Sequence, residues 1–169
     1  SEKDLLNAAP SDATSLSVFE VNYLLSKITV ERVMTRDVIT IDDDCPIEEA
    51  ARIMADKKLG SLPVLRDGKL VGIITETDLF KVFLELLGAR KPGVRLTVLV
   101  ADIPGKLFEL TGVIRDLGGN LISVGTFMGE DPTTINLTIK VSHVSAEALE
   151  KTIEPMVQKI VDIREMKAV

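Results

Sequence analysis

The short segment "GARKPGV" (88–94) most constrains which folds this chain can adopt, because its mixture of Gly, Pro and charged residues is typical of a linker between domains. We place the linker itself at residues 89–93. It divides the 169 residues into two parts, each near the lower size at which a domain can build its own core. The sequence therefore predicts two small domains, and the residue patterns on the two sides of the linker differ.

Before the linker, helices alternate with short apolar runs. Residues 15–26 and 47–54 carry apolar residues at helical spacing, and Pro46 suits the first position of the second helix. The pair Asp67-Gly68 joins two apolar runs and predicts a β-hairpin. We expect a further helix from about Thr77 to Leu87, with its end at Gly88.

After the linker, the pattern predicts the order β-α-β-β-α-β, which is the ferredoxin-like split unit. The third of these strands, "INLTIKV", alternates strictly, so the sequence predicts a sheet with one buried and one solvated face. The expected solvated side consists of Asn136, Thr138 and Lys140. The last helix is expected to begin after Ser145, which can cap it, and to be kinked or shortened at Pro155. The expected fold class of the whole chain is α+β.

Composition and charge exclude several classes of protein. The net charge of −6 argues against a nucleic-acid partner, because nucleic-acid binders usually present a basic face. No apolar run reaches the roughly 18 residues that a membrane helix needs, and no signal peptide is visible at the start. The single Cys excludes an internal disulfide, and we therefore expect a cytoplasmic protein with no membrane partner.

Residues 28–88 contain five short motifs: "VMT" (33–35), "VITI" (38–41), "IEEAARIM" (47–54), "LPV" (62–64) and "GIITETDL" (72–79). With these motifs the segment resembles a cystathionine-β-synthase (CBS) domain, with the expected order β-α-β-β-α. On that template the opening "SEKDLL" matches "TETDLF" and is the tail of a preceding copy. We assign residues 1–27 to this tail and a connecting helix, and we expect about 46 further residues of that copy before Ser1.

Residues 94–169 resemble an ACT domain, a module that senses small molecules. The resemblance rests on "DIPGKL" (102–107) and "GGNLISV" (118–124). The whole arrangement is similar to the acetoin-utilisation type of bacterial regulatory protein, in which CBS copies precede an ACT domain. Such similarity implies regulation, and it does not establish a role in acetoin metabolism.

The segment "GIITETD" predicts an adenosyl site. A strand ends at Ile74, so Thr75 and Asp78 come at a helix N-terminus, where free N–H groups favour a phosphate and a carboxylate can bind ribose hydroxyls. The structural alternative is that Thr75 caps the helix and Asp78 only complements its dipole. The CBS resemblance implies the ligand site, and it places Thr40 near the base and assigns Ser1 and Asp4 to the second site.

The expected ligand is regulatory and no cofactor is expected. Candidates are AMP, ADP, ATP and S-adenosylmethionine. Many nucleotide-binding CBS copies carry His or Arg just before the "LPV"-like segment, whereas this sequence has Gly60 and Ser61 there. This difference favours a monophosphate or an uncharged adenosyl ligand over a triphosphate.

The ACT resemblance implies an amino-acid site formed by Asp102, Gly105 and Asn120. Gly105 lets the backbone approach a ligand at a helix N-terminus, Asp102 can accept from an amino group, and Asn120 can donate and accept. In ACT domains such positions meet across a dimer interface. The alternative is that Asp102 is a helix cap and Asn120 a turn residue.

Catalysis and metal binding are not expected. Cys45 and the lone His143 belong to different predicted domains, and one Cys with one His cannot form a four-ligand structural zinc site. The leading hypothesis is a non-catalytic sensor, which forms a homodimer or a larger homo-oligomer and acts on an effector protein that the sequence does not name. The alternative is an oligomerisation or scaffold module with vestigial sites.

Overall fold

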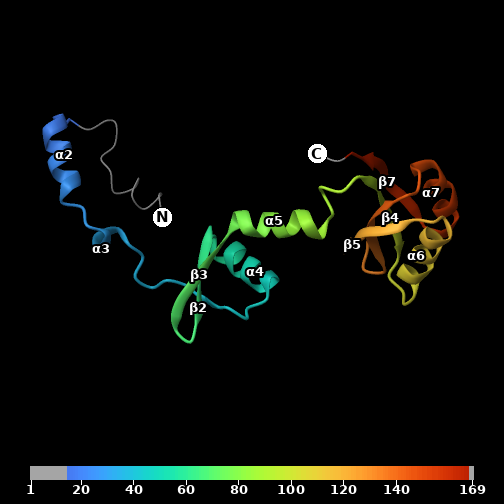
Figure 1. Cartoon of the computed structure of the whole chain (residues 1–169), viewed down its shortest axis with the longest axis horizontal. Coiled ribbons are helices and arrows are strands. Elements are labelled where there is room, and N and C mark those ends of the chain that lie inside the picture. Colours follow the sequence, from blue (N-terminus) through green and yellow to red (C-terminus); the bar gives the residue numbers. More distant parts are fainter. Residues whose placement is uncertain (1–14, 168–169) are drawn as a thin grey trace. The chain divides into compact units, whose positions relative to one another are not determined.

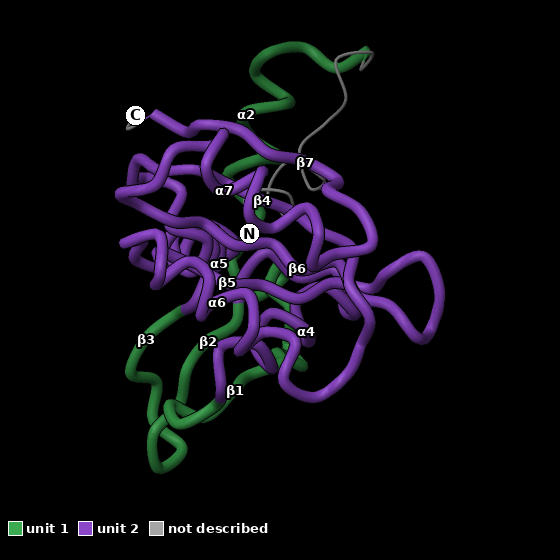
Figure 2. The backbone as a smooth tube through the Cα atoms, turned by 90° about the vertical axis from the view of Figure 1, so that its right-hand side faces the viewer, with its two compact units in different colours: residues 1–45, 62–73 green, residues 46–61, 74–169 purple. Residues whose placement is uncertain are grey.

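The computed structural model describes residues 15–167. These residues divide into two compact units (Figure 2). Unit 1 comprises the chain up to Cys45 together with Leu62–Ile73, and unit 2 comprises Pro46–Ser61 and Ile74–Val169. The predicted Ser1 and Asp4 lie outside the described residues. Each unit is described separately below, with the elements labelled as in Figure 1.

Unit 1 holds two helices and most of a three-stranded sheet. The helices are α2 (Val18–Ser26) and α3 (Val30–Val33), and α2 begins at a capping box between Ser17 and Glu20. The strands β1 (Ile41–Asp42), β2 (Ser61–Arg66) and β3 (Lys69–Thr75) follow the order β1-β2-β3, with β1 parallel to β2. Between β2 and β3, Asp67 and Gly68 both have positive φ, as a tight hairpin turn requires, so the predicted hairpin is confirmed.

Unit 2 begins with two helices, α4 and α5, which lie in residues 28–88 together with the strands β1 to β3. Helix α4 runs over Ile47–Lys57 and α5 over Glu76–Leu86, and they contact each other. The predicted order β-α-β-β-α is therefore present from β1 to α5. Pro46 is the N-cap of α4 and not its first helical residue, so that detail of the prediction was wrong by one position.

The remainder of unit 2, residues 93–166, is called the C-terminal domain here. Its strands are β4 (Gly93–Ala101), β5 (Asn120–Met128), β6 (Thr134–Ser142) and β7 (Lys159–Met166). Its helices are α6 (Lys106–Asp116), α7 (Ala146–Ile153) and the 3-10 turn η1 (Glu154–Met156), which contains Pro155. The sheet order is β5-β6-β4-β7 with antiparallel neighbours, which confirms the predicted βαββαβ arrangement.

The hydrophobic core of the C-terminal domain lies between the sheet and its two main helices. Figure 1 shows α6 and α7 side by side against the strands. The alternating residues of β4 and β6 face these helices, and Leu96, Val98, Ile139, Leu110 and Leu149 are all fully buried. Burial of this single apolar face is the main source of stability for a sheet of this kind.

The opposite face of this sheet is not solvated as the sequence predicted. Lys140 is only 3% exposed and Thr138 only 8% exposed. The Lys140 Nζ donates a hydrogen bond to the Gly88 carbonyl at 2.8 Å, and the Ser123 hydroxyl donates to the Leu87 carbonyl at 3.1 Å. The turn that follows α5 therefore covers part of the polar face and removes these side chains from water.

Gly88 is required at this covering turn. Its φ is +57°, and a Cβ at this position would collide with the side chain of Ile122. The pairing of β5 with β6 shifts between Leu121 and Ser123, as expected for a β-bulge at Ile122. The bulge and the glycine together allow the turn to pack closely on the sheet.

Candidate ligand-binding sites

Thr75 and Asp78 meet at the start of α5. The Thr75 hydroxyl and backbone N–H donate to the same Asp78 carboxylate oxygen, at 2.7 and 3.1 Å, and the Asp78 N–H donates back to the Thr75 hydroxyl at 3.4 Å. The sequence forms this capping box because a hydroxyl and a carboxylate stand three residues apart where a strand ends and a helix begins. Thr75 therefore caps the helix, which is the structural alternative to ligand binding that the sequence left open.

The carboxylate of Asp78 is well stabilised in its charged form. Hydrogen bonds from the Thr75 side chain, then from Lys81, then from the Thr75 backbone lower the pKa of Asp78 below its usual value. Lys81 Nζ lies 3.3 Å from the other carboxylate oxygen, and the Asp78 side chain remains 44% exposed. The group is thus an accessible anion that can still accept hydrogen bonds from a ligand.

The first turn of α5 also carries backbone donors. The Glu76 N–H donates to the Gly60 carbonyl at 3.1 Å, and the Asp78 N–H is used in the capping box. The Thr77 N–H has no acceptor within residues 15–167. One free donor and the positive end of the helix dipole thus remain available to an anion.

A hollow of about 400 Å³ opens beside this turn, entirely within unit 2. Ala51, Met54 and Ala55 of α4 and Leu79 of α5 form its apolar wall, and Lys58 and Glu76 are its charged members. Lys58 takes a left-handed conformation at the end of α4, with φ of 54°. The sequence indicated the hydroxyl and the carboxylate but not this hollow, which depends on the contact between α4 and α5.

Thr40 belongs to unit 1 and immediately precedes β1, where it is exposed. Thr75 and Asp78 belong to unit 2. The assignment of Thr40 to the neighbourhood of the base therefore stays a prediction.

The three residues of the predicted amino-acid site do not meet within one chain. Asp102 follows β4, and Gly105 is the N-cap of α6 with φ of +90°. Asn120 begins β5 and pairs with Ser142, at the opposite end of the sheet from the end of β4. The separation along nine residues of strand is roughly 30 Å.

The alternative role for Asp102 as a helix cap is not realised. The first turn of α6 has no side-chain cap, and the Asp102 carboxylate makes no hydrogen bond or ion pair within residues 15–167. Its backbone N–H donates to the Thr133 carbonyl at 2.8 Å, which anchors the loop. Asp102 and Asn120 are both exposed and are free to contact a ligand or another copy of the chain.

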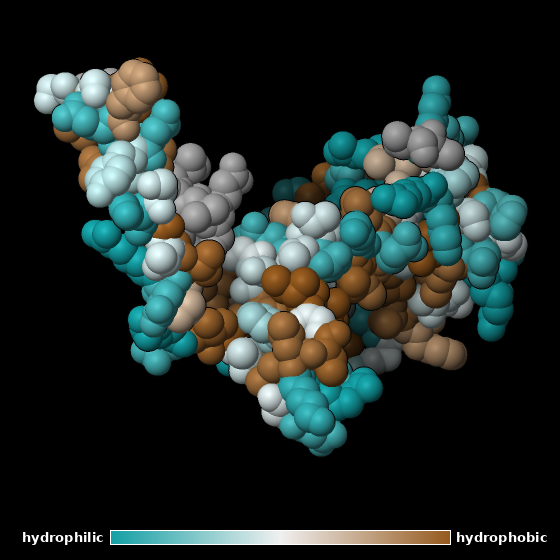
Figure 3. Space-filling model, turned by 60° about the vertical axis from the view of Figure 1, so that its left-hand side comes forward, coloured by the Kyte–Doolittle hydropathy of each residue, from teal (hydrophilic) through white to brown (hydrophobic). Residues whose placement is uncertain are grey.

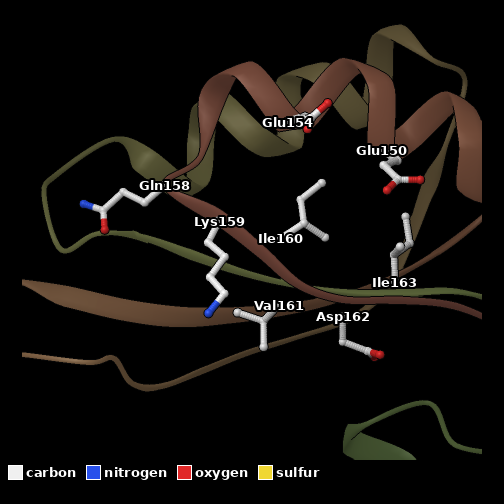
Figure 4. Close-up of a pocket in the computed structure, with 8 residues that line it drawn as sticks. All are labelled: Glu150, Glu154, Gln158, Lys159, Ile160, Val161, Asp162 and Ile163. Carbon is white, nitrogen blue, oxygen red and sulfur yellow. The ribbon is translucent and has the colours of Figure 1, made fainter.

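A hollow of about 600 Å³ along β7 lacks the features of a binding site. Glu150, Glu154 and Gln158 line it together with residues 159–163. Figure 4 shows Ile160 and Ile163 pointing toward the helical side, whereas Val161 and Asp162 point away from it. Asp162 is held by Arg95 at 2.9 Å and by Arg164, whose hydrogen bond is the main reason that its pKa is lowered. The polar groups of this hollow therefore do not converge on a common point.

The comparisons with known proteins identify one part of the chain. The CBS domain family model matches residues 30–85. Residues 30–85 form a CBS domain. The CBS domain includes β1, α4, β2 and β3 and nearly all of α5, and it contains the Thr75–Asp78 capping box.

Several curated proteins share part of this sequence. A homoserine O-acetyltransferase of Methanosalsum zhilinae is 41% identical over 75 residues, covering 41% of this chain and 15% of its own length. An inosine-5'-monophosphate dehydrogenase of Thermoplasma acidophilum is 49% identical over 49 residues, covering 29% of this chain and 10% of its own length. An uncharacterised protein of Methanocaldococcus jannaschii is 36% identical over 76 residues, covering 45% of this chain and 41% of its own length. The chain thus spans less than half the length of each of these relatives.

Two solved structures are also similar. One is a CBS domain pair in complex with 5-methylthioadenosine and S-adenosyl-L-methionine, with 31% identity, coverage of 40% of this chain and 57% of that chain, and a TM-score of 0.33. The other is CBSX2 in complex with AMP, with 33% identity, coverage of 51% and 64%, and a TM-score of 0.40. Because both TM-scores are low, the assignment of the CBS domain rests on the family match.

Among residues 15–167, every helix is too short or too polar to cross a lipid bilayer.

Proposed function

We propose that this chain is a non-catalytic sensor that binds an adenosine nucleotide or another adenosyl ligand through its CBS domain. The observation that carries the proposal is the start of α5, where an exposed carboxylate, a hydroxyl and a free backbone N–H lie within one turn. The carboxylate of Asp78 would accept hydrogen bonds from ribose hydroxyls, and the helix terminus would receive a phosphate. The apolar wall formed by Ala51, Met54 and Leu79 is suited to a base or another apolar group.

The distribution of charge favours a ligand with at most one phosphate. Gly60 and Ser61 place no basic side chain just before Leu62. Among residues 15–167, Lys58 is the only cation that lines the hollow beside α5. Each additional phosphate would need further cationic or N–H partners. We therefore expect AMP or S-adenosylmethionine to bind more tightly than ATP.

The C-terminal domain extends the proposal to a second ligand. We assign it as an ACT domain on its βαββαβ topology and on the motifs around Asp102 and Asn120. Since Asp102 and Gly105 lie at the opposite end of the sheet from Asn120, an amino acid that contacts all three must bind between two copies of the chain. The amino-acid site thus requires a homo-oligomer.

A second candidate function is a scaffold in which these positions only stabilise the fold. The observation in its favour is that the Asp78 carboxylate already accepts three hydrogen bonds, two from the N-cap residue Thr75 and one from Lys81 of the same helix.

Calorimetric titration of the chain with AMP, ADP, ATP, S-adenosylmethionine and a panel of amino acids separates the two candidates. The sensor predicts heat of binding with at least one adenosyl ligand, and the affinity for AMP should exceed that for ATP. A scaffold predicts no heat with any of them.

A further inference from the structure

We propose that the polar face of the C-terminal sheet holds an additional binding site, for a short aliphatic carboxylate that would pair with Lys140. The site is a pocket of about 190 Å³ within unit 2, separate from Asp102, Gly105, Asn120 and the start of α5. The following residues line it: Leu87, Ala89, Arg95, Ser123, Phe127, Thr138, Lys140 and Met166.

Lys140 is a buried cation that has no anionic partner within residues 15–167. It is 3% exposed, and its Nζ has one hydrogen-bond acceptor, the Gly88 carbonyl at 2.8 Å. An ammonium group has three N–H donors, so two remain for a ligand. A buried charge is costly unless it is paired, and a ligand carboxylate would supply the missing partner.

The neighbours of Lys140 increase the local positive charge. In the sheet register, Lys140 pairs with Ser123 of β5 on one side and with Arg95 of β4 on the other. Arg95 in turn pairs with Arg164 of β7, and like charges directly opposite each other are destabilising. The neighbouring carboxylate of Asp162 already forms ion pairs with both Arg95 and Arg164. Burial, and then the nearby Arg95, lower the pKa of Lys140, and the negative charge of a bound anion would oppose both effects by favouring the charged ammonium.

The rest of the pocket selects the kind of anion. Leu87, Ala89, Phe127 and Met166 are apolar, so a ligand with a short hydrocarbon tail fits better than inorganic phosphate. The volume of about 190 Å³ restricts the ligand to a small molecule. In the part of the chain that the structure describes, no acidic side chain lines the pocket, so an α-ammonium group would meet cations and no free carboxylate.

The rim of the pocket reaches solvent. Phe127 is 53% exposed, and the Arg95 side chain is 40% exposed. A small molecule can therefore enter without unfolding the sheet, while the carboxylate end reaches the buried Nζ.

The test compares three nearly identical probes in a low-chloride buffer, with binding to the full chain followed by calorimetry and amide NMR. Isobutyrate carries the carboxylate, isobutyramide replaces it with a neutral amide, and 2-aminoisobutyrate adds an ammonium group. We expect isobutyrate to bind and to shift the amide signals of Ser123 and Lys140, and the other two probes to bind at least about tenfold more weakly.

Lys140→Met is the test variant, because it keeps an unbranched side chain of nearly the same length and removes a buried charge, a change that folded proteins often tolerate. We expect it to weaken isobutyrate binding about ten- to a hundredfold. Lys151→Met, on an exposed part of α7, is the matched control and should leave the affinity unchanged. Asn120→Ala should also leave it unchanged, since the amino-acid site lies elsewhere.

Three outcomes would overturn the proposal. They are the absence of isobutyrate binding, an unchanged affinity in folded Lys140→Met, and equally tight binding of isobutyramide or inorganic phosphate. A melting curve of Lys140→Met establishes that the variant is folded, and the NMR shifts of the parent chain locate the site independently of any variant.

Discussion

Replacing Asp78 by Ala separates ligand binding from helix capping at the start of α5. The change removes the acceptor of the Thr75 hydroxyl at 2.7 Å, of the Thr75 N–H at 3.1 Å and of Lys81 at 3.3 Å. These bonds are local and partly exposed, so we expect the melting temperature to fall by about 2–4 °C, as for loss of one helix cap in a chain of this size.

We expect Asp78→Ala to reduce the affinity for AMP more strongly than it reduces the stability of the fold. If the carboxylate binds the ribose hydroxyls, its removal deletes charge-assisted hydrogen bonds, and the affinity for AMP should fall about ten- to a hundredfold. The loss should be much smaller for a 2′,3′-dideoxy analogue, which lacks the two hydroxyls. Both quantities are measured on the same preparation, by calorimetry and by thermal unfolding, at a temperature where the variant is fully folded.

Glu85→Ala is the matched control, because it removes the same charge from the last turn of the same helix. It should leave the affinity for AMP unchanged. A variant Asp78→Ala that melts early but binds AMP as the parent does would refute the ligand-binding role and leave Asp78 as a capping residue.

Four further predictions concern the rest of the molecule. Light scattering should report a homodimer or a larger assembly, because Leu70 and Ile73 are 70% and 61% exposed and such apolar surface is rarely left uncovered; a monomer would contradict this. Asn120→Ala should weaken the binding of the amino acid by about 1–3 kcal/mol and leave AMP binding intact, as calorimetry would measure. Gly88→Ala should lower the free energy of unfolding by about 1–3 kcal/mol in urea titration, because the new Cβ meets Ile122 at a positive φ; unchanged stability would refute the close packing of this turn. The lowered pKa of Asp78 adds stability above its unfolded pKa of about 3.9 that is lost as pH falls through the lower folded pKa, so Asp78→Asn should flatten the acid limb of melting temperature against pH; an identical acid limb in parent and variant would show that Asp78 does not contribute to it.

Local patterns predicted the local structure of this chain. The Asp67-Gly68 turn, the hydroxyl and carboxylate of the α5 capping box, and the strand β6 itself each depend on neighbouring residues, and each is present in the structure. The expected alternation of buried and solvated residues along β6 is not present, because Thr138 and Lys140 are buried. The same local signals predicted the order βαββαβ along the chain. That order is typical of the ferredoxin-like fold, and the structure has the corresponding four-stranded sheet, β5-β6-β4-β7.

The features that the sequence did not predict depend on contacts between distant residues. Alternation placed Lys140 on the second face of its strand, but only the contact with Gly88, 52 residues earlier, buries it. The register of β5, β6 and β4 places Asp102 and Asn120 at opposite ends of the sheet, and a meeting of these positions across a dimer interface stays a prediction. The sequence signal available for the pocket was a lysine on the second face of an alternating strand, together with a Gly- and Pro-containing segment earlier in the chain that can fold back.

The most direct test of the central claim is to locate the adenosyl ligand on the chain. Titration with AMP, followed by the amide NMR signals of the isotope-labelled protein, reports every backbone N–H in one experiment. The account predicts the largest shifts at Thr75, Thr77 and Asp78, with smaller changes along α5. Binding of AMP that leaves these three amides unshifted and perturbs another part of the chain would contradict it.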